Sequence, residues 1–252
     1  MGRAKEIIVK VIPAKIANEF VKKHHYSGKV VPNSKLHFGC FLDEKLHGVM
    51  SFGNPLDKSK VINLVSGALW NEMLELNRMA FDDYLPLNSE SRCISISIKL
   101  IKKNAPHIKW ILSYADGCQC GDGTIYRASG FILTGIKENK TILKMPDGSI
   151  VADKTLNNSN YKKIGQSAGY WKRNGATPIN GKQLRYIYLI EKSCKITVPI
   201  LPFSKIDEMG AGMYKGKKVS LSDRKNHACE VNEDKRSASS IEIGGSNPTH
   251  TL

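Results

Sequence analysis

Four side chains that can hold or move a proton occupy positions where a fold can expose them. His25 and Tyr26 follow a segment with a helical pattern, Asp116 ends a short apolar run, and Tyr126 comes ten residues later. An imidazole, a phenol and a carboxylate can supply a general base, a hydrogen-bond donor or metal ligands near neutral pH. Plainer roles remain open: a helix cap for the histidine, a turn for Asp116-Gly117, and packing for Tyr126.

The cysteines and glycines argue against several other chemistries. Cys118 and Cys120 form a C-x-C pair, which is too closely spaced for structural zinc without a second pair. Neither a Walker A sequence nor a G-x-G-x-x-G run occurs, so a protein driven by nucleotide hydrolysis is not expected. The six cysteines are expected to be reduced thiols, because the N-terminus lacks the pattern of a secretion signal.

The chain is strongly basic, with 38 Lys and Arg against 23 Asp and Glu among 252 residues, a net charge of +15. Residues 154–195 hold nine basic residues and one acidic residue, with tyrosines and a tryptophan between them. Cations neutralise phosphates and aromatic rings stack on bases, so this segment is predicted to contact nucleic acid. The alternative is a solvated lysine-rich face. The predicted contact residues are Lys162, Lys163, Tyr170, Trp171, Lys172, Arg173, Lys182 and Arg185.

The elements that must position these residues can be predicted in chain order. Helical spacing of apolar residues after Pro13 predicts a helix over residues 13–25. Residues 36–42 and 46–53 are apolar runs separated by a short polar turn, which indicates a hairpin. Residues 73–81 predict a strand, with Leu76 and Met79 on opposite faces because the side chains alternate.

The second half of the pattern alternates helices with strands. A helix is predicted over 88–104, starting at Asn88 or Ser89, followed by a buried central strand over 108–115. Asp122 is expected to cap a short helix, Thr124–Ser129. Strands are expected over residues 131–136 and 183–190. Parallel neighbours need helical crossovers, so this order predicts an α/β fold with a mixed central β-sheet flanked by helices.

Composition sets the expected domain division and location. The 41% hydrophobic content is enough for one substantial core, placed in residues 1–204 with the basic segment 154–195 inside that domain. Residues 205–252 are polar and rich in Gly and Ser, so a loosely ordered tail is expected there. No run of 18 apolar residues occurs, so we expect no membrane partner and a cytoplasmic location.

An ordered set of motifs resembles a known family. It comprises F-V-K-K-H-H-Y-S-G-K at 20–29, L-H-F-G-C-F at 36–41, H-G-V-M-S-F-G-N-P at 47–55, E-L-N-R-M-A-F at 75–81, N-S-E-S-R at 88–92, Y-A-D-G at 114–117 and I-Y-R-A-S-G-F at 125–131. Together they are similar to the Mom family of phage DNA-modification proteins, a branch of the GNAT acyltransferase superfamily. The resemblance covers residues 5–190 and implies a GNAT-like sheet.

The resemblance also implies an activity and a site. The family converts adenine in DNA to its N6-carbamoylmethyl (methylcarbamoyl) derivative, which protects phage DNA from host restriction. Its functional positions match His25, Tyr26, Asp116 and Tyr126, with Ser91 as the expected counterpart of a family serine. Asp116, alone or through His25, would take or orient the N6 proton, and Tyr126 would donate to the departing group.

Cofactor and partner expectations follow from the same resemblance. The family has been linked to iron, for which His25 and Asp116 would be ligands, completed by His24 or His37. DNA and a small-molecule or activated donor are the expected partners, inside the bacterial host cell, in an oligomeric state that the sequence leaves open. Acyl-CoA is one candidate donor, although the superfamily's glycine-rich pyrophosphate loop is replaced by the glycine-free 88–92 motif.

Two other functions fit the same residues. A conventional GNAT N-acetyltransferase would acetylate an amine on a protein, a tRNA or a small molecule. A non-catalytic accessory protein would bind DNA through its basic surface on a decayed transferase fold. Unmodified DNA in cells that express the protein would favour either of these over DNA modification, and acetyl transfer without DNA would separate the two.

Overall fold

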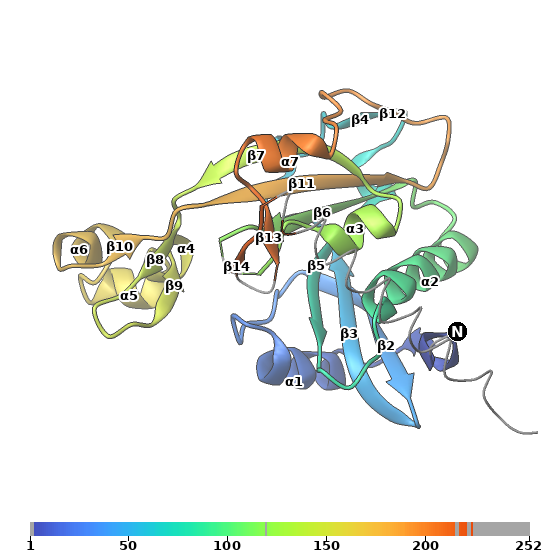
Figure 1. The fold of residues 1–252 in the computed structure, drawn as a ribbon, viewed down its shortest axis with the longest axis horizontal. Coiled ribbons are helices and arrows are strands. Elements are labelled where there is room, and N and C mark those ends of the chain that lie inside the picture. The colour runs from blue at the N-terminus through green and yellow to red at the C-terminus, as the bar shows by residue number, and fades with distance from the viewer. Residues whose placement is uncertain (1–2, 119, 215–216, 221–222, 224–252) are drawn as a thin grey trace, which may run out of the picture.

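The centre of the computed structural model is a seven-stranded mixed sheet in the order β1-β2-β3-β5-β6-β11-β7 (Figure 1). The structure describes residues 3–118, 120–214, 217–220 and 223. The strands of this sheet are β1 (Ile8–Val11), β2 (Ser34–Leu42), β3 (Lys45–Gly53), β5 (Met73–Phe81), β6 (Trp110–Asp116), β7 (Ile132–Asn139) and β11 (Gly181–Leu189). Strands β5 and β6 pair in parallel and the other neighbours are antiparallel. The predicted α/β fold with a mixed sheet flanked by helices is confirmed.

Helices cover both faces of the sheet. The paired residues Val49 and Ala80 contact α1 (Ala14–His24) through Ala17 and Val21. Their chain neighbours Met50 and Met79 point to the opposite face, toward the core under α2 (Ser89–Asn104) and α3 (Thr124–Ala128). Helix α2 is the crossover that the parallel β5 and β6 require. The predicted helices over 13–25, 88–104 and 124–129 are therefore confirmed to within two residues.

Strands β5 and β6 part after a short pairing, and this creates the space for a site. Residues 73–76 pair with residues 110–113, and the structure pairs none of the later residues of the two strands with each other. Strand β5 also carries a bulge, because Ser51 pairs with Arg78 while Phe52 pairs with Leu76. Leu76 and Met79 consequently face the same core, so the strict alternation predicted for 73–81 is wrong beyond Leu76.

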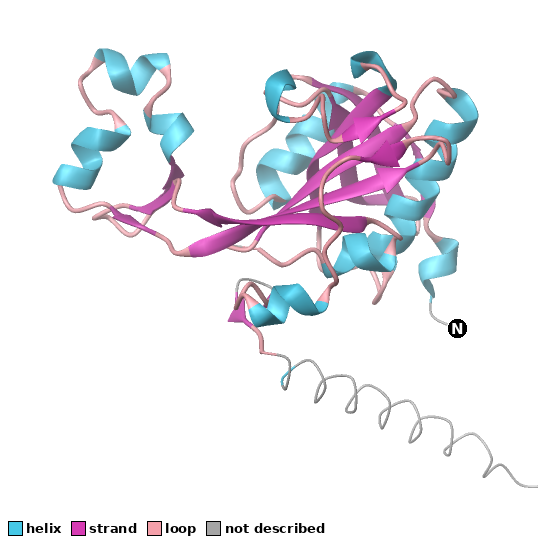
Figure 2. Cartoon of the chain, turned by 90° about the horizontal axis from the view of Figure 1, so that it is seen from above, coloured by secondary structure: helices cyan, strands magenta, loops and turns pink. Residues whose placement is uncertain are grey.

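A separate lobe projects beyond the ends of β7 and β11, as Figures 1 and 2 show. We call residues 140–180 the arm. It has its own three-stranded sheet and three short helices, and its own hydrophobic cluster centred on Leu143, Leu156 and Ala168. Its elements are β8 (Ile142–Lys144), β9 (Ile150–Ala152), α4 (Asp153–Leu156), α5 (Ser159–Lys163), α6 (Ala168–Arg173) and β10 (Thr177–Pro178).

The chain beyond the arm returns to the main core. Strand β11 lies between β6 and β7, and α7 (Ser204–Glu208) buries Ile206 in the core cluster. The division into residues 1–204 and a tail from 205 stays a prediction. The structure adds that the chain packs on the core at least as far as Met213, and residues 224–252 lie outside the described part.

The remaining short elements border the main sheet. They are η1 (Arg3–Glu6), η2 (Lys58–Lys60), η3 (Trp70–Glu72), the pair β4 (Val65–Ser66) with β12 (Lys195–Ile196), and the pair β13 (Met213–Tyr214) with β14 (Lys217–Lys218). Within the described part of the chain, every helix is too short or too polar to cross a membrane.

Candidate active site

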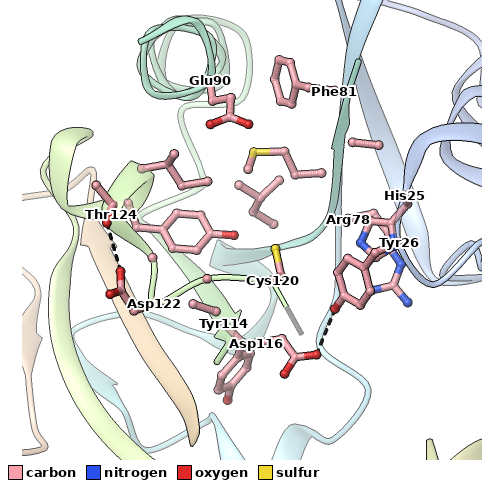
Figure 3. Close-up of a pocket in the computed structure, with 18 of the residues that line it drawn as sticks. His25, Tyr26, Arg78, Phe81, Glu90, Tyr114, Asp116, Cys120, Asp122 and Thr124 are labelled. Carbon is pink, nitrogen blue, oxygen red and sulfur yellow. Dashed lines mark hydrogen bonds between the residues drawn. The ribbon is translucent and has the colours of Figure 1, made fainter. Parts of the chain in front are cut away.

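A cavity of about 370 Å³ opens where β5 and β6 part (Figure 3). His25 and Tyr26 reach it from the end of α1, Asp116 from the end of β6, and Tyr126 from α3. The structure thus brings together four of the five residues that the sequence suggested for chemistry. Residues 90 and 116 lie at opposite ends of the view in Figure 3, so the cavity has two distinguishable ends.

The carboxylate of Asp116 is held from two sides. The backbone N–H of Cys118 donates to Oδ1 at 2.9 Å, and the phenol of Tyr26 donates to Oδ2 at 3.1 Å. Burial, followed by the negative charge of Asp116, raises the pKa of Tyr26 above its ordinary value. Tyr26 therefore stays a neutral hydrogen-bond donor to the carboxylate of Asp116.

His25 is positioned as a neutral imidazole. Its Nδ1 accepts a hydrogen bond from the backbone N–H of Ser27 at 3.1 Å and lies 2.8 Å from the Ser27 hydroxyl. Burial, with a further contribution from the positive charge of Arg78, lowers the pKa of His25 to about 4. The proton is then on Nε2, so at neutral pH His25 can donate a hydrogen bond more readily than it can accept a proton.

Tyr126 is buried in an aromatic cluster with Phe131 and Tyr186, at ring-centroid distances of 5.5 and 5.3 Å. Burial raises the pKa of its phenol to about 12, although the neighbouring Ser113 hydroxyl acts in the opposite direction. Tyr126 is therefore protonated at any ordinary working pH. In the cavity wall it can donate a hydrogen bond or a proton to a developing negative charge.

Arg78 is a functional candidate that the sequence reasoning missed. Its Nε donates to the Lys29 carbonyl at 2.9 Å and Nη1 donates to the Asn77 carbonyl at 3.3 Å. The first of these bonds fastens the loop that carries His25 and Tyr26 to β5. The other donors of this guanidinium form no hydrogen bond or ion pair with a described residue, so the cavity wall offers them to an anion. A charged residue inside an apolar strand was the available signal.

Three more side chains in the wall were not predicted: Glu90, Tyr114 and Cys120. The thiol of Cys120 lines the cavity in Figure 3. Its pKa is raised to about 11 by burial and then by the charges of Asp116 and Glu90, so it is a neutral thiol. Within the part of the chain that the structure describes, Cys120 of the C-x-C pair therefore lies in the cavity wall as a neutral thiol and not as part of a zinc site.

The predicted cap of α3 by Asp122 is wrong, because Gly123 is the N-cap residue and the helix has no side-chain cap; Asp122 anchors α3 through side-chain contacts instead. It is buried, and it accepts hydrogen bonds from the Thr124 hydroxyl at 3.0 Å and the Met213 backbone N–H at 3.1 Å, with an ion pair to Arg127 at 3.1 Å. One carboxylate therefore joins α3, which carries Tyr126, to the C-terminal segment that closes the cavity.

Ser91 does not line the cavity. Its hydroxyl donates back to the carbonyl of Asn88 at 3.2 Å, within the first turn of α2. Asn88 is the N-cap residue in a left-handed conformation, φ 67°, and makes no side-chain cap. The assignment of Ser91 to the site therefore stays a prediction that nothing in this geometry supports.

The residues present do not fit an iron site. Among the described residues, no group of three or more His, Cys, Asp or Glu is arranged to hold a metal ion. Tyr26 occupies one oxygen of Asp116 and Ser27 occupies Nδ1 of His25. Of the two suggested third ligands, His37 is buried and bonds Ser51 at 2.8 Å, while His24 lines the cavity with its ring stacked on Phe20.

The predicted DNA-contacting residues fall into two groups. Six lie in the arm: Lys162, Lys163, Tyr170, Trp171, Lys172 and Arg173. Two lie in β11 of the main sheet, where Lys182 pairs with Glu138, and Arg185 donates to the Thr134 hydroxyl and carbonyl at 3.0 and 2.8 Å. In the arm, Lys172 pairs with Asp153 at 3.0 Å. The segment 154–195 is therefore not one continuous surface.

Glu75 of β5 provides a test of the electrostatics beside the site. Burial raises its pKa to about 7, against the opposing charges of Arg78 and Lys154. A carboxyl with a raised folded pKa stabilises the fold below its unfolded value of 4.5 and loses that contribution as pH rises through 7. We expect Glu75→Gln to be increasingly favourable relative to wild type from pH 5 to pH 8, by about 2 kcal/mol.

Urea unfolding at pH 5, 6, 7 and 8 measures this difference. Glu19→Gln is the matched control, because Glu19 is an exposed residue of α1. The control should show no trend with pH. A stability difference between Glu75→Gln and wild type that stays constant across this range would contradict the raised pKa.

A mixed sheet whose central strands frame a cavity lined by imidazole, phenol and carboxylate groups defines an α/β enzyme. The model of the Mom protein family matches residues 6–205, and the chain belongs to this family. The methylcarbamoylase mom of Escherichia phage Mu is 34% identical over 195 residues, which cover 76% of this chain and 79% of that protein.

Solved structures with some likeness are acetyltransferases. The ribosomal-protein-S18-alanine N-acetyltransferase of Escherichia coli has a TM-score of 0.41 at 10% identity, over 73% of this chain and 94% of that one. A Bacillus subtilis acetyltransferase in complex with CoA has a TM-score of 0.42 at 10% identity, over 73% and 99%. These TM-scores are low, and the fold is defined by the strand order of the central sheet.

Proposed function

We propose that this chain is a methylcarbamoylase that converts adenine in phage DNA to N6-carbamoylmethyl adenine and so protects the DNA from restriction. Family membership over residues 6–205 supports the reaction class. The observation that carries the proposal is the cavity, in which Tyr26 from the loop after α1 and Asp116 from the end of β6 meet across the gap between β5 and β6. A carboxylate held in this way can accept a proton from an incoming amine.

The product joins the adenine N6 to a CH₂ carbon, which sets the proton balance. N6 forms the new bond and gives up one proton, while the donor's leaving group departs with the electron pair of the bond it breaks. In our proposal Asp116 accepts or orients the N6 proton. Tyr126 donates to the departing group, and His25 donates a hydrogen bond through Nε2.

The target amine lies inside the duplex, so the base has to leave the stack. Extrusion of one nucleotide costs a few kcal/mol and places the base in a pocket. The half-exposed ring of Tyr26 borders the end of the cavity at Asp116 and can stack on such a base. We place the adenine at this end and the donor at the Glu90 end.

The donor is proposed as an activated small molecule. Transfer of an acetyl group gives an amide, so acetyl-CoA alone cannot produce an N–CH₂ bond. Glu90 lies at the donor end and α2 starts without a glycine-rich turn, so a pyrophosphate is poorly matched there. We therefore propose a donor other than simple acetyl-CoA.

Mass spectrometry of nucleosides from cells that express the protein tests the function. The expected result is a modified deoxyadenosine heavier by the carbamoylmethyl group, absent from cells with the empty vector. Unmodified DNA together with acetyl transfer to an amine would point to a conventional acetyltransferase instead. Unmodified DNA with salt-sensitive DNA binding and no transfer would point to an accessory protein.

A further inference from the structure

We infer that the arm, residues 140–180, holds the phosphate backbone of double-stranded DNA beside the target base, while the cavity does the chemistry. The inference rests on the proposed function, since it assumes that DNA is the substrate. It narrows the predicted contact surface, because it excludes Lys182 and Arg185 of β11. It also adds Lys140 and Lys144, which lie outside the predicted segment 154–195, and Lys154, which lies inside it but was not among the predicted contact residues.

The charge of the arm is available to a ligand. Residues 140–180 contain seven Lys and Arg against two Asp. Lys172 is paired with Asp153. The side chains of the other six residues form no hydrogen bond or ion pair with any residue that the structure describes, and these residues are exposed: Lys140, Lys144, Lys154, Lys162, Lys163 and Arg173. A projecting lobe with unpaired cations and a small core of its own matches a polyanion better than a neutral partner.

The root of the arm lies directly beside the proposed catalytic carboxylate. Gly117 follows Asp116, and its backbone N–H donates to the Lys182 carbonyl at 2.8 Å. A Cβ atom on Gly181 would approach the Cys118 Cα to 2.7 Å, so only glycine allows this crossing. The start of β11, one of the two strands that carry the arm, therefore lies against the residues that follow Asp116, which fixes where the arm begins relative to Asp116.

A second contact links the arm to the other wall of the cavity. The Lys29 ammonium donates to the Thr155 hydroxyl of α4 at 3.1 Å. Lys29 belongs to the loop after α1 that carries His25 and Tyr26, and its carbonyl is held by Arg78. The arm thus borders the adenine end of the cavity from both sides. Duplex held along it would present a neighbouring nucleotide to that end.

The side chains of the arm are better suited to contact DNA phosphates than to read bases. The unpaired groups are lysines and one arginine spread over several short elements, with no strand or long helix shaped to enter a groove. Such contacts position a duplex without reading its sequence. The arm is therefore expected to contribute affinity with a strong dependence on salt, and little choice of sequence.

The test compares two triple variants of the full chain. The arm variant carries Lys162→Ala, Lys163→Ala and Arg173→Ala. The control carries Lys99→Ala, Lys102→Ala and Lys103→Ala on the exposed side of α2, and it removes the same charge. Dissociation constants for a duplex are measured by fluorescence anisotropy between 50 and 300 mM NaCl. Thermal melting checks that both variants are folded.

The arm variant should bind on the order of 10- to 100-fold more weakly near 0.15 M salt, with a log–log salt slope shallower by about 2 to 3. The control should bind like wild type. Equal weakening in both triples, or wild-type binding by the arm variant, would overturn the inference. A second arm variant, Lys140→Ala with Lys144→Ala, repeats the test without altering α5 or α6.

The nucleoside measurement on the wild-type protein separates the two proposals. If wild-type cells contain modified adenine and the arm variants bind duplex normally, the proposed function is retained and the proposed role of the arm is rejected. If the DNA of cells that express the wild-type protein is unmodified, the proposed function is rejected, whatever the arm binds.

Discussion

Asp116→Asn is expected to lower the rate of adenine modification by about 100- to 10,000-fold while the protein stays folded. The amide cannot accept a proton, so the N6 amine keeps its proton as the new bond forms. It can still accept a hydrogen bond from the Cys118 N–H and donate one to the Tyr26 oxygen, which preserves the arrangement seen at 2.9 and 3.1 Å. The loss should therefore be chemical and not structural.

The measurement is a time course of modified deoxyadenosine in cells that express each variant at matched levels. Asp83→Asn is the control, because Asp83 is an exposed carboxylate away from the cavity. It should modify DNA like wild type. Near-normal modification by Asp116→Asn would remove the carboxylate from the mechanism and leave Tyr126 or His25 to be considered in its place.

Long elements with a clear period could be predicted from the sequence. Helix α1 is one example, and the hairpin of β2 and β3 could be predicted from its two apolar runs and the short polar turn between them. The arm could not be predicted as a separate lobe. Its strands and helices are two to six residues long, too short to show a period, and its core forms only when distant residues such as Leu143 and Ala176 meet.

Part of the candidate site could also be predicted from the sequence. His25 and Asp116 follow regular elements, and residues at the ends of helices and strands are where sites are commonly built. Arg78 was hidden in an apparently regular strand. Its position depends on the bulge in β5 and on the point where β5 parts from β6, and both are properties of strand pairing that no local pattern contains.

The neutral state of His25 changes how the site is expected to work. A histidine at the end of a helix suggests a cation, since the helix dipole favours one there. In the structure burial and Arg78 lower its pKa to about 4, so the carboxylate of Asp116 is left as the base. The proposed division of labour between these two residues therefore follows first from the burial of His25 and then from the position of Arg78, which the sequence reasoning did not include.

Tyr126→Phe is expected to lower the modification rate by about 100-fold or more, because in the proposed mechanism the phenol donates to the departing group. The ring remains packed between Phe131 and Tyr186, so the free energy of unfolding should change by no more than about 1 kcal/mol. Tyr188→Phe is the matched control, since Tyr188 also packs on Phe131 but does not line the cavity.

The pH dependence distinguishes a donor from a base at this position. Because the pKa of Tyr126 is raised to about 12, its phenol stays protonated between pH 6 and 10. In an extract that supplies the donor, Tyr126→Phe should therefore reduce the rate by the same factor throughout that range. A defect that appears only at high pH would mean that Tyr126 acts as a phenolate. In that case the proton of N6 would go to Tyr126, and Asp116 would serve to orient the amine.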